Sequence, residues 1–258
     1  MPPRTDEQIA DSIRANSARG LRVLGEAYPP HDRLAVVVCY GPSLTYTWEG
    51  IRDEGGDIWT TSGAHAFLVT RGIHVFGHTD VDPRPHKARV LTALDFRTHF
   101  YIPSRVHPDY MARMVLVQNK TLYHVGVPAE ERVLEEVAPG RPRVPCAITA
   151  GLCLVQLLLH LGYRRFVIYG MDGSAPEGTA KHAGDHPNKA EPFDSEVEIG
   201  GRCFHTNMLM LNALEDFFAI ATQYPMGTFQ FRGWGMIPWA EECSRKGGTR
   251  PPPRASNE

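Results

Sequence analysis

A turn with the sequence Gly41-Pro42-Ser43 directly follows an apolar run and has residue types that suit a phosphate. Gly41 lets a ligand approach the backbone closely, Pro42 fixes the turn, and Ser43 can offer a hydroxyl and a backbone N–H at the start of a helix. Asp172 ends another apolar run and is the acidic residue that we most expect to face a ligand. These residues predict a nucleotide site, although the turn alone is also compatible with an ordinary link between a strand and a helix.

Two carboxylates, Asp80 and Asp82, stand two positions apart at the end of a third apolar run. At this spacing they can hold a divalent cation such as Mg²⁺ against a nucleotide diphosphate, or orient a ribose hydroxyl. Pro83 follows, so the pair is equally compatible with a common Asp-Pro turn. Ser62, at the end of a further predicted strand, is another candidate for nucleotide binding.

A polar stretch over residues 177–195 is far longer than an ordinary connection, and loops of this length in a compact domain are usually lids or binding loops. Its cationic and protonatable side chains suit the neutralisation of the phosphate of a leaving nucleotide. A solvated loop is the alternative. The side chains concerned are Lys181, His182, Asp185, His186 and Lys189.

His205 stands beside the predicted start of a late helix, for which Thr206 or Asn207 would be the N-cap. A neutral imidazole can accept a proton from a hydroxyl near physiological pH, so His205 is a candidate general base. A lone histidine is more often structural, and that alternative stays open.

The elements that would position these residues alternate between strands and helices, and this order predicts an α/β fold. We expect a Rossmann-like three-layer sandwich with a mostly parallel sheet, a small hairpin at residues 197–204 and the long lid loop. In such sheets ligands bind outside the carboxyl ends of the strands, where the motifs above fall. The predicted strands are 33–40, 57–61, 73–79, 100–102, 114–117, 123–125, 166–170 and 228–231, and the predicted helices are 6–28, 65–71, 148–161 and one that opens at 205–207.

The composition indicates a folded globular protein of 258 residues, with 42% hydrophobic and 22% charged residues. A formal net charge of −2 provides no general field that would attract a polyanion. Five scattered cysteines disfavour a disulfide framework and a structural zinc site. We divide the chain into a peripheral N-terminal helix (1–30), an α/β domain (31–243) and a disordered tail (244–258).

Neither a signal peptide nor a membrane span is evident, so we expect a cytoplasmic protein. Trp234 and Trp239 are candidates for a self-association surface, and a homo-oligomer is therefore possible, although buried aromatic residues are the more common outcome.

Three motifs follow one another along the chain: Val-Val-Val-Cys-Tyr-Gly-Pro-Ser-Leu at 36–44, Gly-Ile-His-Val-Phe-Gly-His-Thr-Asp-Val-Asp-Pro at 72–83 and Leu-Gly-Tyr-Arg-Arg-Phe-Val-Ile-Tyr-Gly-Met-Asp-Gly-Ser at 161–174. These motifs, in this order, resemble the MptE-like family, which includes archaeal 6-hydroxymethylpterin diphosphokinases. The likeness covers about residues 33 to 240. The same order more distantly resembles the family 42 bacterial sialyltransferases and the Maf flagellin glycosyltransferases.

The likeness to the sialyltransferases implies roles for three segments. Their Gly-Pro-Ser-Leu turn lies at the cytidine nucleotide, their Ile-Thr-Ser-Gly segment contacts the donor and matches residues 148–151, and their general base is a histidine in the place of His205. Two tyrosines assist phosphate departure in those enzymes, but no tyrosine occurs here between Tyr169 and Tyr224. Lys181, His182 or His186 would then take that role.

The leading hypothesis is therefore a glycosyltransferase that moves a sugar from a CMP- or UDP-linked donor to a hydroxyl of a glycan, a modified base or a small molecule. One alternative is an Mg-ATP-dependent diphosphokinase that acts on a hydroxymethylpterin-like substrate, with Asp80 and Asp82 as metal ligands. A second alternative is a non-catalytic nucleotide-binding protein. The predicted catalytic residues are His205, His182 and Asp172, and the predicted nucleotide-binding residues are Gly41, Pro42, Ser43, Ser62, Asp80, Thr149, Gly151 and Lys181.

Overall fold

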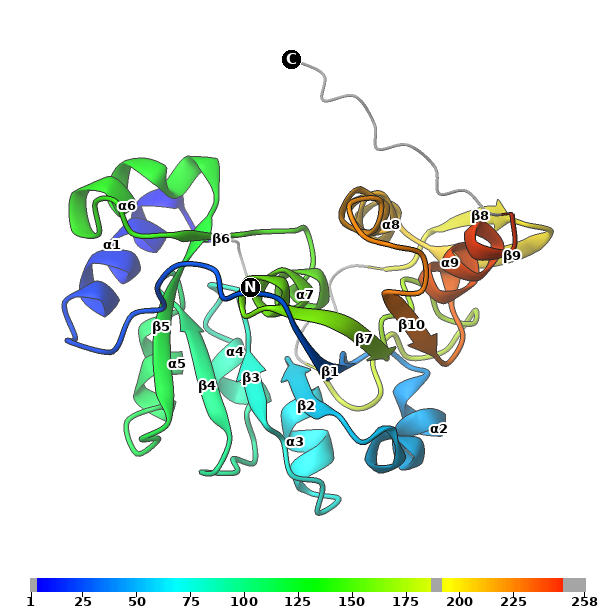
Figure 1. Ribbon diagram of the computed structural model, residues 1–258, viewed down its shortest axis with the longest axis horizontal. Coiled ribbons are helices and arrows are strands. Elements are labelled where there is room, and N and C mark those ends of the chain that lie inside the picture. Colours follow the sequence, from blue (N-terminus) through cyan, green and yellow to red (C-terminus); the bar gives the residue numbers. More distant parts are fainter. Residues whose placement is uncertain (1–3, 187–191, 248–258) are drawn as a thin grey trace.

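The computed structural model describes residues 4–186 and 192–247, and eight of the described strands form one parallel sheet in the order β10-β7-β1-β2-β3-β4-β5-β6 (Figure 1). Every neighbouring pair in this sheet is parallel. A separate antiparallel hairpin is formed by β8 and β9. The strands are β1 (His31–Val38), β2 (Asp57–Thr61), β3 (Gly77–Thr79), β4 (His99–Pro103), β5 (Lys120–Gly126), β6 (Arg143–Pro145), β7 (Tyr163–Tyr169), β8 (Ser195–Ile199), β9 (Arg202–Thr206) and β10 (Phe229–Arg232).

Helices connect these strands, as parallel neighbours require. They are α1 (Asp6–Ser17), α2 (Leu44–Thr47), α3 (Ala64–Val69), α4 (Lys87–Val90), α5 (Pro108–Arg113), α6 (Glu131–Val137), α7 (Ala150–His160), α8 (Met208–Ala221) and α9 (Met236–Gly247), with 3₁₀ turns η1 (Trp48–Glu54) and η2 (Pro128–Glu130).

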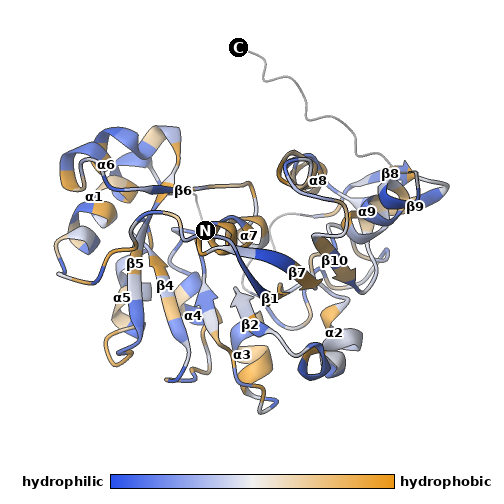
Figure 2. Ribbon diagram, in the orientation of Figure 1, coloured by the Kyte–Doolittle hydropathy of each residue, from blue (hydrophilic) through white to orange (hydrophobic). Residues whose placement is uncertain are grey.

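The central strand β1 is buried on both faces of the sheet. Ala35 and Val37 pack in a core cluster that contains the apolar side of α7, whereas Val36 and Val38 pack in a second cluster with Leu68 of α3. Figure 2 shows hydrophobic residues along α7 and at the C-terminal end of β7, and mostly hydrophilic residues on the β8–β9 hairpin. Successive side chains of a strand point to opposite faces, so an unbroken apolar run indicates a helix layer on each side. The predicted three-layer α/β sandwich is confirmed.

Most predicted elements of the sheet are confirmed, but the strand predicted at 114–117 is wrong. Met114 and Val117 are buried in a local core that includes Tyr110 and Met111 of α5, and their backbone forms turns. The run is apolar because it fills this core. The strand predicted at 73–79 is shorter than expected, since only β3 has strand pairing there.

The two ends of the described chain also differ from the predictions. The predicted helix 6–28 ends at Ser17, and the segment after it makes a parallel bridge between Val23 and Leu122 of β5. At the other end, residues 244–247 belong to α9 instead of a disordered tail, and the indole N–H of Trp239 in this helix donates to the Ile199 carbonyl at 2.8 Å. The rest of that predicted tail, from 248, lies outside the described residues.

Among the described residues, none of the helices combines the length and apolar character that a membrane crossing requires.

Candidate functional site

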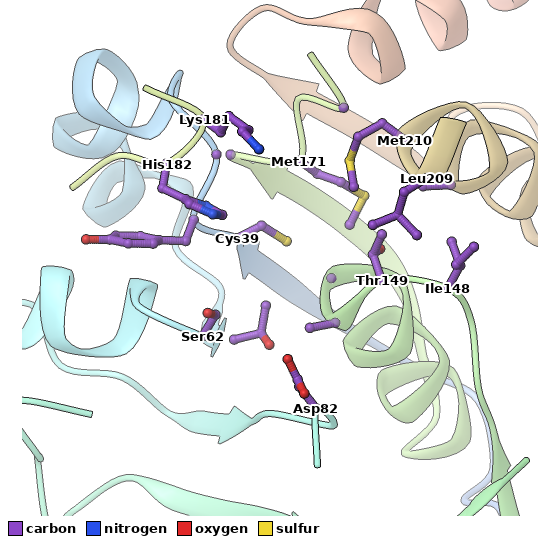
Figure 3. Close-up of a pocket in the computed structure, with 18 of the residues that line it drawn as sticks. Cys39, Ser62, Asp82, Ile148, Thr149, Met171, Lys181, His182, Leu209 and Met210 are labelled. Carbon is purple, nitrogen blue, oxygen red and sulfur yellow. The ribbon is translucent and has the colours of Figure 1, made fainter. Parts of the chain in front are cut away.

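A cavity of about 390 Å³ opens at the carboxyl ends of β1, β2 and β7 (Figure 3). The chain runs from β1 through β2 to β6 on one side of the sheet and then returns to β7 on the other side of β1. Connections from β1 and β7 therefore lead in opposite directions, and this reversal of strand order leaves the crevice in which open α/β sheets bind ligands. Residues 39–42 after β1 and residues 170–174 after β7 both line the cavity.

The turn after β1 is held by the acid after β7. The backbone N–H of Ser43 donates to Asp172 Oδ2 at 2.8 Å, and the Ser43 hydroxyl donates to Asp172 Oδ1 at 2.5 Å. Ser43 is fully buried and is not among the described residues that line the cavity. The prediction that Ser43 offers these donors to a phosphate is therefore wrong for this conformation, because both donors already bind Asp172.

Asp172 lines the cavity, but its carboxyl group is turned into this internal contact. Burial raises the pKa of Asp172 to about 7, and the two hydrogen bonds from Ser43 oppose that rise. Removal of a carboxylate from water disfavours its charged form, and donors that face the carboxylate restore part of the loss. Asp172 thus fixes the geometry of the Gly-Pro-Ser turn.

Gly41 is required by close packing between the β1 and β7 turns. Its backbone N–H donates to the Gly170 carbonyl at 2.8 Å. A Cβ at Gly41 would lie 2.4 Å from that carbonyl oxygen and 2.5 Å from Asp172 Oδ2, which is too close for any side chain. The predicted close approach at Gly41 is therefore made by the protein's own backbone, and Gly41 and Pro42 both line the cavity.

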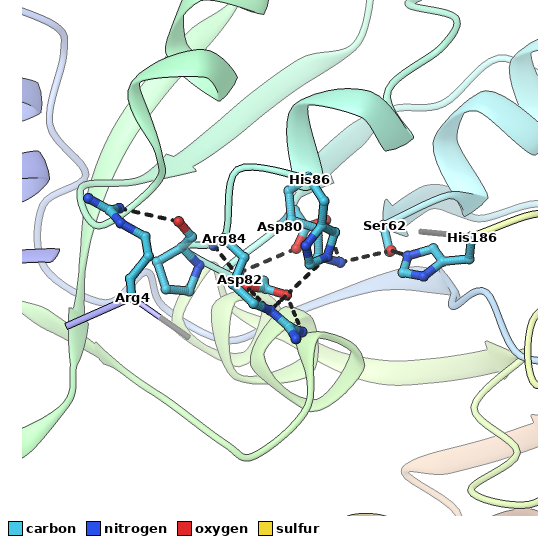
Figure 4. Close-up of polar contacts among 9 residues, drawn as sticks. Arg4, Ser62, Asp80, Asp82, Arg84, His86 and His186 are labelled. Atoms are coloured by element: carbon cyan, nitrogen blue, oxygen red, sulfur yellow. Dashed lines mark hydrogen bonds and ion pairs between the residues drawn. The ribbon is translucent and has the colours of Figure 1, made fainter. Parts of the chain in front are cut away.

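Asp80 lies behind the cavity and forms a buried ion pair with a lysine. Lys87 Nζ is 3.1 Å from Asp80 Oδ2 and donates to Ser62 Oγ at 3.0 Å (Figure 4). Lys87 lines the cavity, whereas Asp80 is not among the described lining residues. Burial raises the pKa of Asp80, and Lys87 opposes this rise. Asp80 thus positions Lys87, and the cation is the group of this pair that a ligand can reach.

Asp82 is occupied by Arg84. The guanidinium Nε lies 2.9 Å from both carboxylate oxygens of Asp82, and Nη2 lies 2.7 Å from Oδ2. Burial raises the pKa of Asp82, but these contacts with Arg84 and the charge of Lys87 outweigh it and leave the pKa lowered. The described residues contain no cluster of three metal-ligating side chains. Two carboxylates that are each paired with a cation do not fit a magnesium site, so the metal role predicted for Asp80 and Asp82 is not supported.

Ser62 lies at the cavity with a backbone conformation that is unusual for its type. Its φ of 54° falls in the left-handed region, which non-glycine residues rarely adopt. The Ser62 hydroxyl contacts His186 Nε2 at 3.2 Å in addition to Lys87. Strained residues of this kind concentrate at functional sites. Ser62 lines the cavity, and its role in nucleotide binding stays a prediction.

The lid loop lies against the turn after β1. The Ala183 N–H donates to the Tyr40 carbonyl at 3.1 Å, and the His182 ring stacks on the Tyr40 ring at a centroid distance of 6.0 Å. Lys181, His182 and His186 all line the cavity. The structure thus brings together the lid and the Gly-Pro-Ser turn, as expected, although Lys189 lies outside the described residues and Asp185 is not one of the described lining residues.

The two lid histidines differ from the lysine in charge. Burial lowers the pKa of His182 to about 4 and that of His186 to about 3, and the nearby Lys87 contributes in the same direction. Both imidazoles are therefore neutral at pH 7. They can donate or accept hydrogen bonds there, but they do not bring the positive charge that we expected, whereas the cationic side chains of Lys181 and Lys87 line the same cavity.

The segment before α7 provides another wall. Thr149 is the N-cap of this helix, and its Oγ1 accepts the Leu152 N–H at 3.4 Å. A Cβ on Gly151 would lie 2.7 Å from Cys39 Sγ, so only glycine fits against β1 there. Both Thr149 and Gly151 line the cavity, at the place where the likeness to the sialyltransferases puts donor contacts.

His205 lies in β9, next to the cavity segments but outside the described lining. Its carbonyl accepts the Ala175 N–H at 3.2 Å, and its buried Nδ1 has no hydrogen-bond partner among the described residues. The helix that it precedes begins at Met208, with Asn207 as N-cap. The structure therefore does not place the His205 ring where it could reach a ligand in the cavity.

Several residues that line the cavity were not predicted from the sequence. Lys87, Arg84 and Arg105 bring positive charge, and Arg105 is paired with Glu130 at 2.9 Å. Their position in the sequence could have indicated them, since these basic residues follow the ends of β3 and β4.

Met171, Leu209 and Met210 form an apolar wall of the cavity (Figure 3). The sequence pattern could not distinguish an apolar helical residue such as Leu209 from a residue of the core.

Comparison with known proteins gives a match by fold alone. No protein-family model matches the sequence, and no curated protein does. The fold is similar to a Maf glycosyltransferase from Magnetospirillum magneticum AMB-1, with a TM-score of 0.65 and 16% identity over 90% of this chain. The chain spans 37% of the length of that glycosyltransferase. The expected likeness to the Maf proteins is therefore confirmed for the fold.

Two structures of a mammalian sialyltransferase, one with Gal-beta-1-3GalNAc-ortho-nitrophenol, also align with the chain. They cover 91% of this chain and 81% of theirs at 12% identity, with TM-scores of 0.47 and 0.46. The resemblance to the MptE-like family stays a prediction from the sequence.

Proposed function

We propose that the protein is a glycosyltransferase that binds a nucleotide-linked sugar in the cavity at the ends of β1 and β7. The observation that carries this proposal is the position of the cavity at the reversal of strand order, with a lid whose residues Lys181 and His182 face it. The fold shared with a Maf glycosyltransferase favours a transferase of this kind over the alternatives.

The nucleotide phosphate would lie near the basic side chains of the cavity. Lys181 comes from the lid and Lys87 from the start of α4, and both line the cavity. Charge-assisted hydrogen bonds from such groups stabilise a phosphate as it leaves. The sugar and acceptor would then lie against the wall that Thr149, Met171 and Met210 form. The acceptor classes proposed are a glycan, a modified base and a small molecule.

In the transfer step, the acceptor hydroxyl oxygen forms a bond with the anomeric carbon of the sugar while the bond from that carbon to the phosphate oxygen breaks. The electron pair of the broken bond stays on the nucleotide phosphate, which Lys181 neutralises. The hydroxyl proton passes to a neutral imidazole. CMP- and UDP-linked sugars are the donors proposed.

Two histidines are candidates for that imidazole. A general base must lie within reach of the proton that it accepts. Among the described residues that line the cavity, His182 is present and His205 is not. We therefore propose His182 as the base in this conformation. A role for His205 requires the hairpin to approach the cavity when the acceptor binds, and the variants below separate the two.

The diphosphokinase and the non-catalytic nucleotide-binding protein are the competing proposals. The first needs ATP with Mg²⁺, for which the ion-paired Asp80 and Asp82 are poor ligands in this conformation. A cytoplasmic location and self-association remain predictions from the sequence.

The test has two stages. A thermal-shift screen with CMP, UDP, GDP, ADP and ATP, each with and without Mg²⁺, identifies the nucleotide, because a ligand that binds the native state raises the melting temperature. Hydrolysis and transfer of the corresponding nucleotide-linked sugars are then measured. The proposal predicts stabilisation by CMP or UDP without a need for metal, donor turnover, and loss of turnover in His182→Ala.

Other results would favour the competing proposals. Stabilisation by ATP only with Mg²⁺ supports the diphosphokinase, and stabilisation without turnover of any donor supports a binding protein. Turnover that survives in His182→Ala but is lost in His205→Ala returns the role of the base to His205.

A further inference from the structure

Two cysteines lie in contact at the edge of the cavity. Cys146 Sγ and Cys153 Sγ are 3.3 Å apart, within hydrogen-bond distance for sulfur. Cys146 follows β6, is half-buried and lines the cavity, whereas Cys153 is buried in the first turns of α7. A thiol that a small reagent can reach is thus backed by a second thiol that is shielded from solvent.

The backbone between them holds the sulfurs in place. The Ala147 N–H donates to Cys153 Sγ at 3.2 Å, and the Cys153 thiol lies 3.0 Å from the Ala147 carbonyl. The hydrogen bond from Cys153 lowers the pKa of Cys146, burial opposes this, and the charge of Arg105 adds to the lowering. The pKa of Cys153 is raised, chiefly because it donates that hydrogen bond. Cys146 is therefore the better nucleophile of the pair.

We propose that Cys146 and Cys153 are a two-thiol oxidation site, at which a peroxide oxidises Cys146 and Cys153 then closes a reversible disulfide with it. The Cys146 thiolate attacks one peroxide oxygen, the O–O bond breaks, and Cys146 becomes a sulfenic acid while the other oxygen leaves as water after it takes a proton. Cys153 sulfur then attacks Cys146 sulfur and expels the sulfenic oxygen, which leaves as a second water. Two thiols lose two electrons, and the peroxide gains them.

The closed disulfide would affect the cavity directly. Sulfur atoms 3.3 Å apart must approach to about 2.05 Å, and the ring so formed encloses residues 147–152. Thr149 and Gly151, which line the cavity, belong to this segment. The oxidation site is therefore part of the wall of the cavity, whatever ligand that cavity binds.

The test is oxidation of the full-length protein with hydrogen peroxide, followed by alkylation of free thiols and peptide mass spectrometry. Two other thiols serve as internal controls in the same sample. Cys203 is exposed and is not among the described residues that line the cavity. Cys39 lines the cavity but is buried, and this burial strongly raises the pKa of its thiol. We expect the peptide that contains Cys146 and Cys153 to lose the mass of two hydrogens, which reports the disulfide. This loss should proceed at least about tenfold faster than the oxidation of Cys203, and dithiothreitol should reverse it.

A variant separates the two steps. In Cys153→Ser, Cys146 should stop at the sulfenic acid, which dimedone traps, and no disulfide should form. The proposal is overturned if peroxide oxidises Cys203 while Cys146 and Cys153 both remain alkylatable in the wild type. It is equally overturned if Cys146 is oxidised in the wild type but never pairs with Cys153. None of these readouts depends on a nucleotide or on transferase activity.

Discussion

The strand-end acids after β7 and after β3 have the same position in the fold but opposite roles. Asp172 accepts two hydrogen bonds from the neutral donors of Ser43 and holds the turn after β1. Asp80 and Asp82 each pair with a cation, Lys87 or Arg84, at the edge of the same cavity. Neither region presents a bare carboxylate to a ligand. The first region shapes the cavity, and the second positions positive charge at it.

This difference shows that the position of an acidic side chain at a strand end does not determine which group it pairs with. The end of a parallel strand predicts that a polar side chain gathers at the ligand-binding edge. Whether that side chain is available to a ligand depends on what faces it, and a buried carboxylate that stays charged requires a donor or a cation beside it. Substitutions in each region test this division of roles.

The largest effect is expected in the charged region, for Lys87→Met. This change leaves Asp80 buried without its cation, and a buried charge that loses its partner costs about 3 kcal/mol of stability. Chemical denaturation of the variant measures the loss. The double variant Lys87→Met with Asp80→Asn should recover much of it, because no buried charge is then left unpaired. Equal stability of the single and double variants would contradict the role of this ion pair.

The next effect is expected in the neutral region, for Gly41→Ala. The added methyl group would meet the Gly170 carbonyl and the Asp172 carboxylate, and overpacking of this kind costs about 2 kcal/mol. Gly25→Ala is the matched control, because a Cβ there meets nothing within 4 Å, and it should change stability by less than about 0.5 kcal/mol. If both variants unfold at the same denaturant concentration, the close approach of the two turns is not as described.

A pH dependence should distinguish Asp172, whose pKa is raised, from Asp82, whose pKa is lowered. With its pKa raised to about 7 from 3.8, the folded protein keeps a proton that the unfolded chain has lost over this range. The contribution of Asp172 to the free energy of unfolding therefore falls as pH rises from about 4 to about 7. Asp172→Asn removes this contribution, so the stability of the wild type relative to the variant should fall by roughly 2 kcal/mol between about pH 5 and 8.

Denaturation of both proteins at the two pH values measures this difference, which cancels the contributions of groups common to both, such as His182. A constant difference across the range would mean that Asp172 titrates in the folded protein as it does in the unfolded chain.

The smallest effect is expected on binding, for Lys181→Met. Loss of one charge-assisted contact to a phosphate should weaken nucleotide binding about tenfold, or about 1.4 kcal/mol. Lys246→Met is the control, because Lys246 pairs with Glu242 in α9 and is not among the described residues that line the cavity. This substitution should leave the affinity for the nucleotide unchanged.

The sequence predicted the sheet and the edge at which the site lies because buried parallel strands leave continuous apolar runs, as in β1. It could not predict the pairings across that edge. Ser43 was identified correctly as a donor at a turn, but its acceptor, Asp172, lies 129 positions further along the chain. Lys87 was overlooked because nothing in its local sequence shows that it meets Asp80 and Ser62 in a buried contact.

The lid shows a similar limit. Its histidines were expected to carry positive charge, but burial against Tyr40 and nearby Lys87 keeps His182 neutral. The burial of these side chains depends on how the loop packs on the rest of the chain, and this packing cannot be predicted from a local sequence pattern.

The most direct test of nucleotide binding at this cavity is isothermal titration calorimetry of CMP and UDP into the wild type, Lys181→Met and Lys246→Met, with EDTA present throughout. We expect one of these nucleotides to bind the wild type with one-to-one stoichiometry, Lys181→Met to weaken this binding about tenfold and Lys246→Met to leave it unchanged. Absence of binding by either nucleotide, or equal affinity of Lys181→Met and the wild type, would contradict it.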